Sequence, residues 1–163
     1  MIPLAFATMG ALMLAASSSP APQYVIRGDD APSYAILNNK GSAKLYLNAT
    51  TGAPEAGLSL VTLESGAAVP EHRHPKSAEI LYVQSGTIDM VIDGQRLTAE
   101  AGDAIYIPKN TPHQATNPHA HLAVTAVQIY VHAGPEQRFA KGQRIVTKMN
   151  PKAADAANQS TKQ

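Results

Sequence analysis

The chain has 163 residues, a length that suits one domain with a substantial core and is too short for two domains of ordinary size. Its 13 Lys and Arg residues nearly balance its 12 Asp and Glu residues and form no cluster, so the electrostatic footprint of a nucleic-acid partner is missing. The chain contains no cysteine, which excludes disulfides, cysteine-based zinc sites and thiol nucleophiles.

Residues 1–20 open with a run of apolar and small residues, Met1 to Ala16, which a Ser/Pro-rich stretch follows. Such a run is typical of a secretory signal peptide, although no Lys or Arg precedes it here. A buried N-terminal helix or strand is the alternative. We therefore expect an exported protein, periplasmic or secreted, with no stable membrane span once the signal is removed.

Short apolar runs alternate with turn residues from Tyr24 onward, which is the pattern of an all-β domain over residues 21–149. Hairpin turns are expected at 38–41 and, with a type I′ geometry, at Asp93–Gly94. The predicted strands are 24–27, 34–38, 43–48, 58–63, 80–83, 87–92, 95–99, 104–107, 122–132 and 144–148. About ten short strands indicate a sandwich or a barrel, and periodicity does not decide between the two.

The C-terminal part of the chain departs from the strand pattern. A short helical turn is expected near 135–141, and the polar segment 150–163 is predicted to be disordered.

The chemistry of the chain is concentrated in residues 66–86. His72 and His74 are two positions apart, so an extended segment places both imidazoles on one face, and Glu79 can join them once the chain bends. Two imidazoles and one carboxylate that converge on a point form a site for a divalent metal ion that lacks only further ligands. His113, which follows a short strand and a proline-bounded turn, is the candidate for the missing ligand.

The spacing of these residues resembles the two paired motifs of the cupin superfamily. The first motif runs from Gly66 through His72, His74 and Glu79 to Gly86, and the second runs over 102–117 through Pro108, Asn110 and His113. Fifteen residues separate the two motifs, as in small single-domain bacterial cupins, and the resemblance covers about residues 58–132 closely. One position departs from the pattern, because Asn110 replaces a glycine, and asparagine tolerates the left-handed conformation that such a turn requires.

The resemblance implies a single jelly-roll β-barrel with the metal ion inside its mouth. It assigns the ligand positions to His72, His74, Glu79 and His113, and the turn positions to Gly66, Gly86, Gly102 and Pro108. It also implies a homodimer, for which the sequence has no independent sign.

Other polar residues of the chain carry weaker signals. His119, His121 and His132 are interpreted as solvated or strand-end histidines rather than as a second site. Arg73 lies between two inward histidines and should point away from them. Five residues on strands are candidates to line the cavity, without a fixed register: Tyr82, Tyr106, Gln114, Gln128 and Tyr130.

Three histidines and a glutamate suit one divalent transition metal ion, which could be Mn, Fe, Ni, Cu, Co or Zn. The resemblance to quercetin-dioxygenase-like cupins implies a dioxygenase-type oxidoreductase that acts on a small oxygen-containing substrate able to chelate the metal. Glu79 is then a ligand and a possible base. The alternatives are a metal-dependent decarboxylase, lyase or isomerase, or a non-catalytic module that binds a small molecule or metal.

Overall fold

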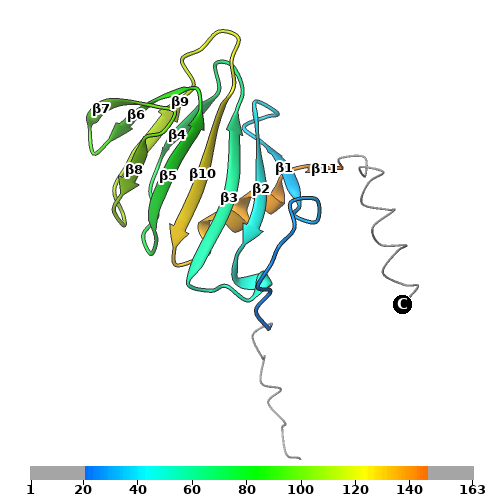
Figure 1. The fold of residues 1–163 in the computed structure, drawn as a ribbon. Coiled ribbons are helices and arrows are strands. Elements are labelled where there is room, and N and C mark those ends of the chain that lie inside the picture. The colour runs from blue at the N-terminus through cyan, green and yellow to red at the C-terminus, as the bar shows by residue number, and fades with distance from the viewer. Residues whose placement is uncertain (1–20, 147–163) are drawn as a thin grey trace, which may run out of the picture.

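The computed structural model describes residues 21–146 (Figure 1). The predicted signal peptide at 1–20 and the predicted disordered tail at 150–163 lie outside these residues, as do the ends of the predicted domain at 149 and of its last strand at 148. Those assignments, and the export that depends on the first of them, stay predictions.

The larger of two antiparallel sheets has seven strands in the order β11-β1-β2-β3-β10-β5-β8. Its centre consists of three strands of eight residues each. The strands, in chain order, are β1 (Ser33–Ile36), β2 (Gly41–Leu47), β3 (Ala56–Leu63), β5 (Ala78–Ser85), β8 (Ala104–Ile107), β10 (Val124–Val131) and β11 (Arg144–Ile145).

The smaller sheet has four strands in the order β4-β9-β6-β7. They are β4 (Ala68–His72), β6 (Thr87–Ile92), β7 (Gln95–Glu100) and β9 (His113–Thr116). Two short 3-10 helices complete the described residues, η1 (Ala49–Thr51) and η2 (Pro135–Lys141), and the second is the helical turn expected near 135–141. Figure 1 shows η2 in orange against the larger sheet, where it contacts β1 and β3.

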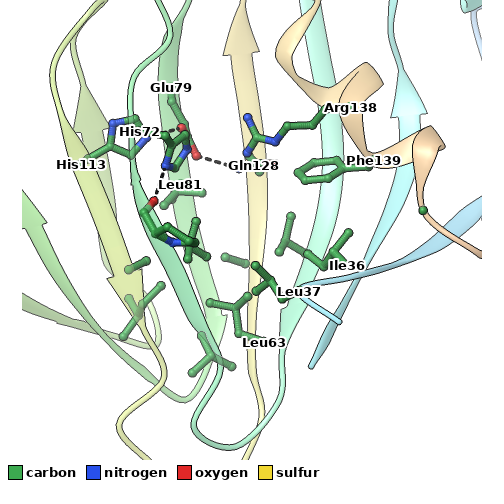
Figure 2. A pocket seen from close by; sticks show the side chains of 18 of the residues that line it. Ile36, Leu37, Leu63, His72, Glu79, Leu81, His113, Gln128, Arg138 and Phe139 are labelled. Carbon is green, nitrogen blue, oxygen red and sulfur yellow. Dashed lines mark hydrogen bonds and ion pairs between the residues drawn. The ribbon is translucent and has the colours of Figure 1, made fainter. Parts of the chain in front are cut away.

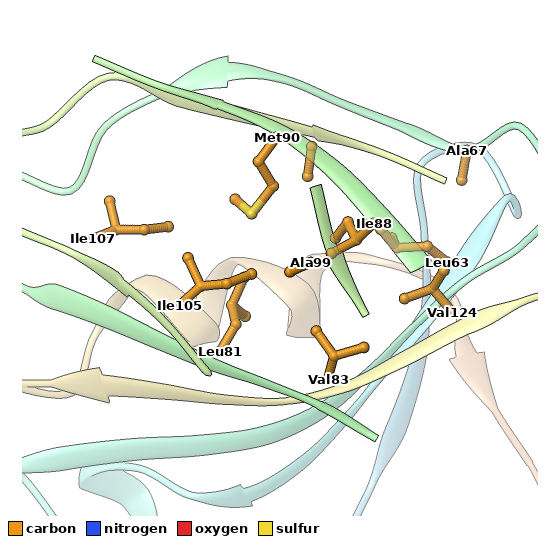
Figure 3. Close-up of a cluster of buried hydrophobic side chains, with 11 residues drawn as sticks. Leu63, Ala67, Leu81, Val83, Ile88, Met90, Ala99, Ile105, Ile107 and Val124 are labelled. Carbon is orange, nitrogen blue, oxygen red and sulfur yellow. The ribbon is translucent and has the colours of Figure 1, made fainter. Parts of the chain in front are cut away.

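The main hydrophobic core lies between the two sheets (Figure 3). Leu81 and Val83 of β5 and Ile105 of β8 contribute from the larger sheet, and Ile88 and Met90 of β6 face them from the smaller sheet. Because the two sheets bury a common core, the fold is the jelly-roll sandwich or barrel that the motifs predict. No helix within residues 21–146 is long and apolar enough to cross a membrane.

Two predicted turns have the backbone that their residues require. Asp93 and Gly94 have φ values of 49° and 78°, which are the two positive angles of a type I′ turn between β6 and β7. Asn110 has a φ of 61°, so the asparagine does take the left-handed position usually held by glycine. Its backbone N–H donates to the carbonyl oxygen of His74 at 2.9 Å, which ties the second motif to the first.

Three predictions from the sequence need correction. The predicted strand 24–27 does not form, because Tyr24 and Val25 are exposed and no strand pairs with them. The turn expected at 38–41 begins earlier, with positive φ already at Leu37, so that Gly41 opens β2. The strands β4 and β9, which carry His72 and His113, were not predicted.

Candidate metal centre

Both sheets contribute to the cluster of candidate ligands. His72 is the last residue of β4 and His113 the first residue of β9, and the two stand opposite each other in the smaller sheet. Glu79 lies on β5 of the larger sheet, and His74 lies in the connection between β4 and β5. The fold therefore brings all four predicted ligands to one place, at the end where the two sheets meet.

The donor atoms of these four side chains all lie within 4.8 Å of one another, a grouping that could hold a metal ion. Oε2 of Glu79 is 3.0 Å from Nε2 of His74 and 3.1 Å from Nε2 of His113. Three of the four residues are buried, and His72 is half-buried. Within residues 21–146 this is the one such cluster, so His119 and His121 do not form a second.

The ring nitrogens fit a metal ion at this place. Nδ1 of His72 donates to the carbonyl oxygen of Pro70 at 2.9 Å, and Nδ1 of His113 donates to that of Thr111 at 2.8 Å. A histidine that binds a metal through one nitrogen commonly anchors the other nitrogen in this way. Nε2 of His72 is buried and makes no hydrogen bond, so its lone pair is free for an ion, and Nε2 of His74 is buried 3.0 Å from Oε2 of Glu79.

The second oxygen of Glu79 belongs to a buried hydrogen-bond chain. Nε2 of Gln128 donates to Oε1 of Glu79 at 2.7 Å, and Oγ of Ser59 donates to Oε1 of Gln128 at 3.1 Å. Burial would raise the pKa of the Glu79 carboxyl, but its contacts with His113, His74 and Gln128 outweigh that effect and lower the pKa to about 2. Glu79 is therefore held as a carboxylate whose Oε2 alone faces the histidines.

The surroundings shift the pKa values of His72 and His113 in opposite directions. Burial lowers the pKa of His72, and the positive charges of His113 and Arg138 lower it further. Burial also acts to lower the pKa of His113, but its hydrogen bonds to Glu79 and Thr111 raise it overall. The surroundings of His113 thus favour the protonated form of its ring.

A cavity of about 960 Å³ opens from the cluster (Figure 2). At one end of it Gln128 and Arg138 stand beside the ligands, and a few other polar residues, among them Asn38 and Lys141, also line it. The remaining walls are mostly apolar and come from both sheets and from η2; they include Ile36, Leu37, Leu63, Leu81 and Phe139. Such a cavity suits a small organic molecule with a polar part and an apolar body.

Only some of the predicted cavity residues lie in it. Gln128 lines the cavity, and Tyr130 is fully buried beside it, with its ring 4.9 Å from that of His74. Tyr82 and Tyr106 are on the outer face of the larger sheet, 47% and 64% exposed. Gln114 alternates with the inward His113 and Ala115, so it faces away.

Two other expectations can be compared with the structure. His121 and His132 are exposed and His119 is half-buried in its loop, as expected for histidines outside the site. Arg73 was expected to point away from the site, yet it is among the residues that line the cavity. The strand β4 ends at His72, so the alternation that predicted the opposite no longer applies at Arg73.

Sequence reasoning missed Arg138 and Phe139. They follow His113 by more than twenty residues and belong to no motif, so only the way η2 folds back onto β1 and β3 brings them to the cavity. The sequence did predict a short helical turn after the last long strand, but it did not indicate where that turn would pack.

Comparisons with known proteins agree with this architecture. A family model described as a cupin domain matches residues 59–130. The polyketide synthase CurC of Streptomyces cyaneus is 31% identical over 68 residues, which make up 42% of this chain and 44% of that protein. Across the curated relatives, the aligned segments span from 26% to 67% of the relative's own length.

Two solved structures show the same fold. An RmlC-like cupin from Shewanella frigidimarina has a TM-score of 0.60 at 18% identity, over 71% of this chain and 96% of that one. A predicted oxalate decarboxylase from Thermotoga maritima has a TM-score of 0.57 at 19% identity, over 66% and 98%. These matches do not single out the quercetin-dioxygenase-like cupins, so that narrower resemblance stays a prediction. Residues 59–130 thus match the cupin domain, and the residues that the structure describes share the fold of these cupins.

Proposed function

We propose that the protein is a metal-dependent enzyme, of the dioxygenase type, that acts on a small organic substrate through oxygen atoms that chelate the metal. One observation carries the proposal: three imidazoles and a carboxylate converge at the polar end of a cavity whose other walls are mostly apolar. His72, His74, Glu79 and His113 would hold the ion. When bound there, a divalent transition metal ion supplies a Lewis acid and a place for two oxygen donors to meet.

The residues around the ligands would fix the site and keep it dry. Gln128 holds Oε1 of Glu79, so the carboxylate presents one oxygen and leaves room beside it for substrate. The low pKa of Glu79 and this hydrogen bond favour the role of a ligand over that of a base. The apolar walls exclude water from a bound substrate, which strengthens every polar contact made at the site.

The volume of the cavity bears on the size of the substrate. A molecule as small as oxalate would leave most of about 960 Å³ unfilled, so we favour a substrate with an apolar or aromatic body. The relative CurC carries the name of a polyketide synthase, and a polyketide-like enol or diketone has both an oxygen chelate and such a body. A metal-dependent decarboxylase, lyase or isomerase could use the same ligands and remains the alternative reaction.

Elemental analysis of the purified protein and of three single variants tests the site. We expect about one transition metal ion per chain in the unaltered protein and a small fraction of that in His72→Ala and His113→Ala. His121→Ala is the matched control, since that histidine is exposed and lies outside the cluster, and it should keep its metal. Unchanged metal content in both ligand variants would rule out the assignment.

Oxygen uptake tests the reaction. Protein loaded separately with Fe, Mn, Co, Ni, Cu or Zn is mixed with pentane-2,4-dione or with a flavonol, while oxygen and substrate are followed together. A dioxygenase that cleaves the diketone consumes one O₂ per diketone and places both oxygen atoms in the two products, with no external reductant. Substrate loss with release of CO₂ and no oxygen uptake would support the decarboxylase. Metal-dependent binding without turnover over a broad panel would support the non-catalytic module.

We also propose that two copies of the chain associate through the outer face of the larger sheet. Val127 and Ile129 of β10 point outward there, because the residues that alternate with them are buried. Val127 stands between Leu60 and Tyr82 in the neighbouring strands, so the apolar surface is continuous across three strands. An apolar patch of this kind marks an interaction surface.

Light scattering on the purified protein tests this association. We expect the mass of a dimer, and the mass of a monomer after Val127→Lys, which places a charge at the centre of the patch. Gln95→Lys, at an exposed position of β7 in the other sheet, should remain a dimer. A dimer in Val127→Lys would show that another surface is used.

A further inference from the structure

Arg138 holds a charged group over the polar end of the cavity. Its guanidinium points from η2 toward Gln128 and Glu79 (Figure 2). Nη2 of Arg138 donates to the hydroxyl of Tyr130 at 3.4 Å, and the ring of Tyr130 packs edge-on against the ring of His74. One aromatic ring therefore separates this guanidinium from a candidate metal ligand, a distance that a small molecule can bridge.

The backbone that carries Arg138 is anchored on both sides. Glu136 is fully buried, and its Oε2 accepts a hydrogen bond from the backbone N–H of Gly134 at 2.7 Å. Phe139 is buried in a second core cluster with Ala43 and Leu45 of β2. The guanidinium also lies 4.8 Å from the centre of the Phe139 ring, which restrains the side chain. Arg138 is thus presented by a fixed element rather than by a free loop.

Within the described residues 21–146, the charge of Arg138 has no carboxylate partner. Its contact with Tyr130 uses one of five N–H donors. Three basic residues line the cavity, Arg73, Arg138 and Lys141, against the carboxylates of Glu71 and Glu79. A divalent ion at the ligands would add two further positive charges, so the loaded cavity attracts an anion.

We infer that Arg138 binds an acid group of the substrate. The inference rests on the proposed function, and it deepens it by naming the substrate class: an organic carboxylate whose chelating oxygens are separate from its acid group. The chelating oxygens would bind the metal ion that the four ligands hold. The carboxylate pairs with the guanidinium of Arg138, and the apolar body fills the rest of the cavity. A planar guanidinium binds a carboxylate through two parallel hydrogen bonds, which makes Arg138 a specificity residue as well as an attractive charge.

A pair of diketones that differ only in a terminal carboxylate or methyl group tests this assignment. Both 4,6-dioxoheptanoate and heptane-2,4-dione can chelate a metal, but only the first carries a carboxylate. Their dissociation constants are measured by calorimetry on metal-loaded and metal-free protein. We expect Arg138→Gln to weaken binding of the acid roughly tenfold, as for loss of a charge-assisted hydrogen bond at a partly exposed site, and to leave the neutral diketone within about twofold.

Two further variants sharpen the result. Arg138→Lys keeps the charge but loses the fork, so its affinity for the acid should lie between those of the unaltered protein and Arg138→Gln. Arg96→Gln removes an exposed arginine of β7, away from the cavity, and should change neither constant. Equal melting temperatures of all four proteins show that η2 keeps its place.

The outcomes separate this inference from the proposed function. An acid affinity that Arg138→Gln leaves unchanged, or a neutral diketone weakened as much as the acid, overturns the role of Arg138 whatever the metal does. If Arg138→Gln weakens the acid but neither diketone needs the metal to bind, the Arg138 subsite stands and the metal-dependent function falls.

Discussion

Glu79 is a residue where burial and charge oppose each other. A carboxylate is costly to bury unless its lone pairs are satisfied, and here each oxygen has its own partners. Oε2 faces His74 and His113, and Oε1 accepts from Gln128, which Ser59 contacts in turn. The amide of Gln128 cannot be reversed, because a carboxylate only accepts hydrogen bonds and must face the NH₂ group. Gln128 is therefore a positioning residue for the ligand Glu79.

Replacing Gln128 with leucine tests this role. Oε1 of Glu79 then loses its donor while it stays buried, so the free energy of unfolding should fall by about 1–3 kcal/mol. Loss of such a support for a metal ligand typically weakens metal binding by about 10–100-fold. A chelator competition titration measures the affinity, and thermal unfolding measures the stability. Gln114→Leu is the control, since that side chain faces away from the cavity and its loss should change stability by less than about 0.5 kcal/mol. Equal metal affinities in the two variants would contradict the positioning role.

The four ligands could be predicted from sequence because each is tied to a local pattern. His72, His74 and Glu79 belong to the first motif, and the second motif supplies His113 on a turn that Asn110 can adopt. Gln128 could be named only as one of several candidates, because a strand shifted by one residue would turn it outward. Arg138 could not be placed at all, since its position depends on how η2 packs after the last long strand.

Two strands, β4 and β9, could not be predicted from the sequence. β4 contains Pro70 and has a register irregularity between Val69 and His72, and β9 is only four residues long. Neither segment has the run of β-branched residues by which strands are recognised. Tyr24 and Val25 show the opposite error, because residues with high strand propensity form no strand without a partner to pair with.

The docking of η2 on the larger sheet depends on a glycine of β3. A Cβ at Gly57 would lie 2.5 Å from Oε2 of Glu136, and that oxygen cannot yield easily because Gly134 binds it and the side chain is buried. We therefore expect Gly57→Ala to displace η2 and to destabilise the fold by about 1–3 kcal/mol, as overpacking does.

Thermal unfolding and binding of 4,6-dioxoheptanoate measure the effect of Gly57→Ala, since Arg138 moves with η2. Gly28→Ala is a control at a glycine where the added methyl group would meet its nearest neighbour, the hydroxyl of Tyr46, at an ordinary distance of 3.7 Å. A Gly57→Ala protein with unchanged melting temperature and ligand affinity would show that the helix adjusts without cost.

The candidate ligands join the two sheets of the molecule at one end of the sandwich. Glu79 belongs to the seven-stranded sheet, while His72 and His113 belong to the four-stranded sheet. The hydrophobic core holds the sheets together elsewhere, so an ion bound by these residues acts as a second, polar connection between them. Binding to this site should therefore stabilise the whole fold and not only a loop.

Removal of the metal gives the corresponding prediction for the whole molecule. An ion that binds only the folded chain, at a free concentration 100 times its dissociation constant, stabilises that state by about 2.7 kcal/mol. For a domain of this size such a change raises the melting temperature by roughly 10 °C, and a chelator should reverse it. Calorimetric scans with and without metal measure the shift, and His113→Ala should unfold at the same temperature in both. An equal shift in His113→Ala would mean that the ion binds outside this cluster, because the only ligand that β9 supplies would then have no effect on it.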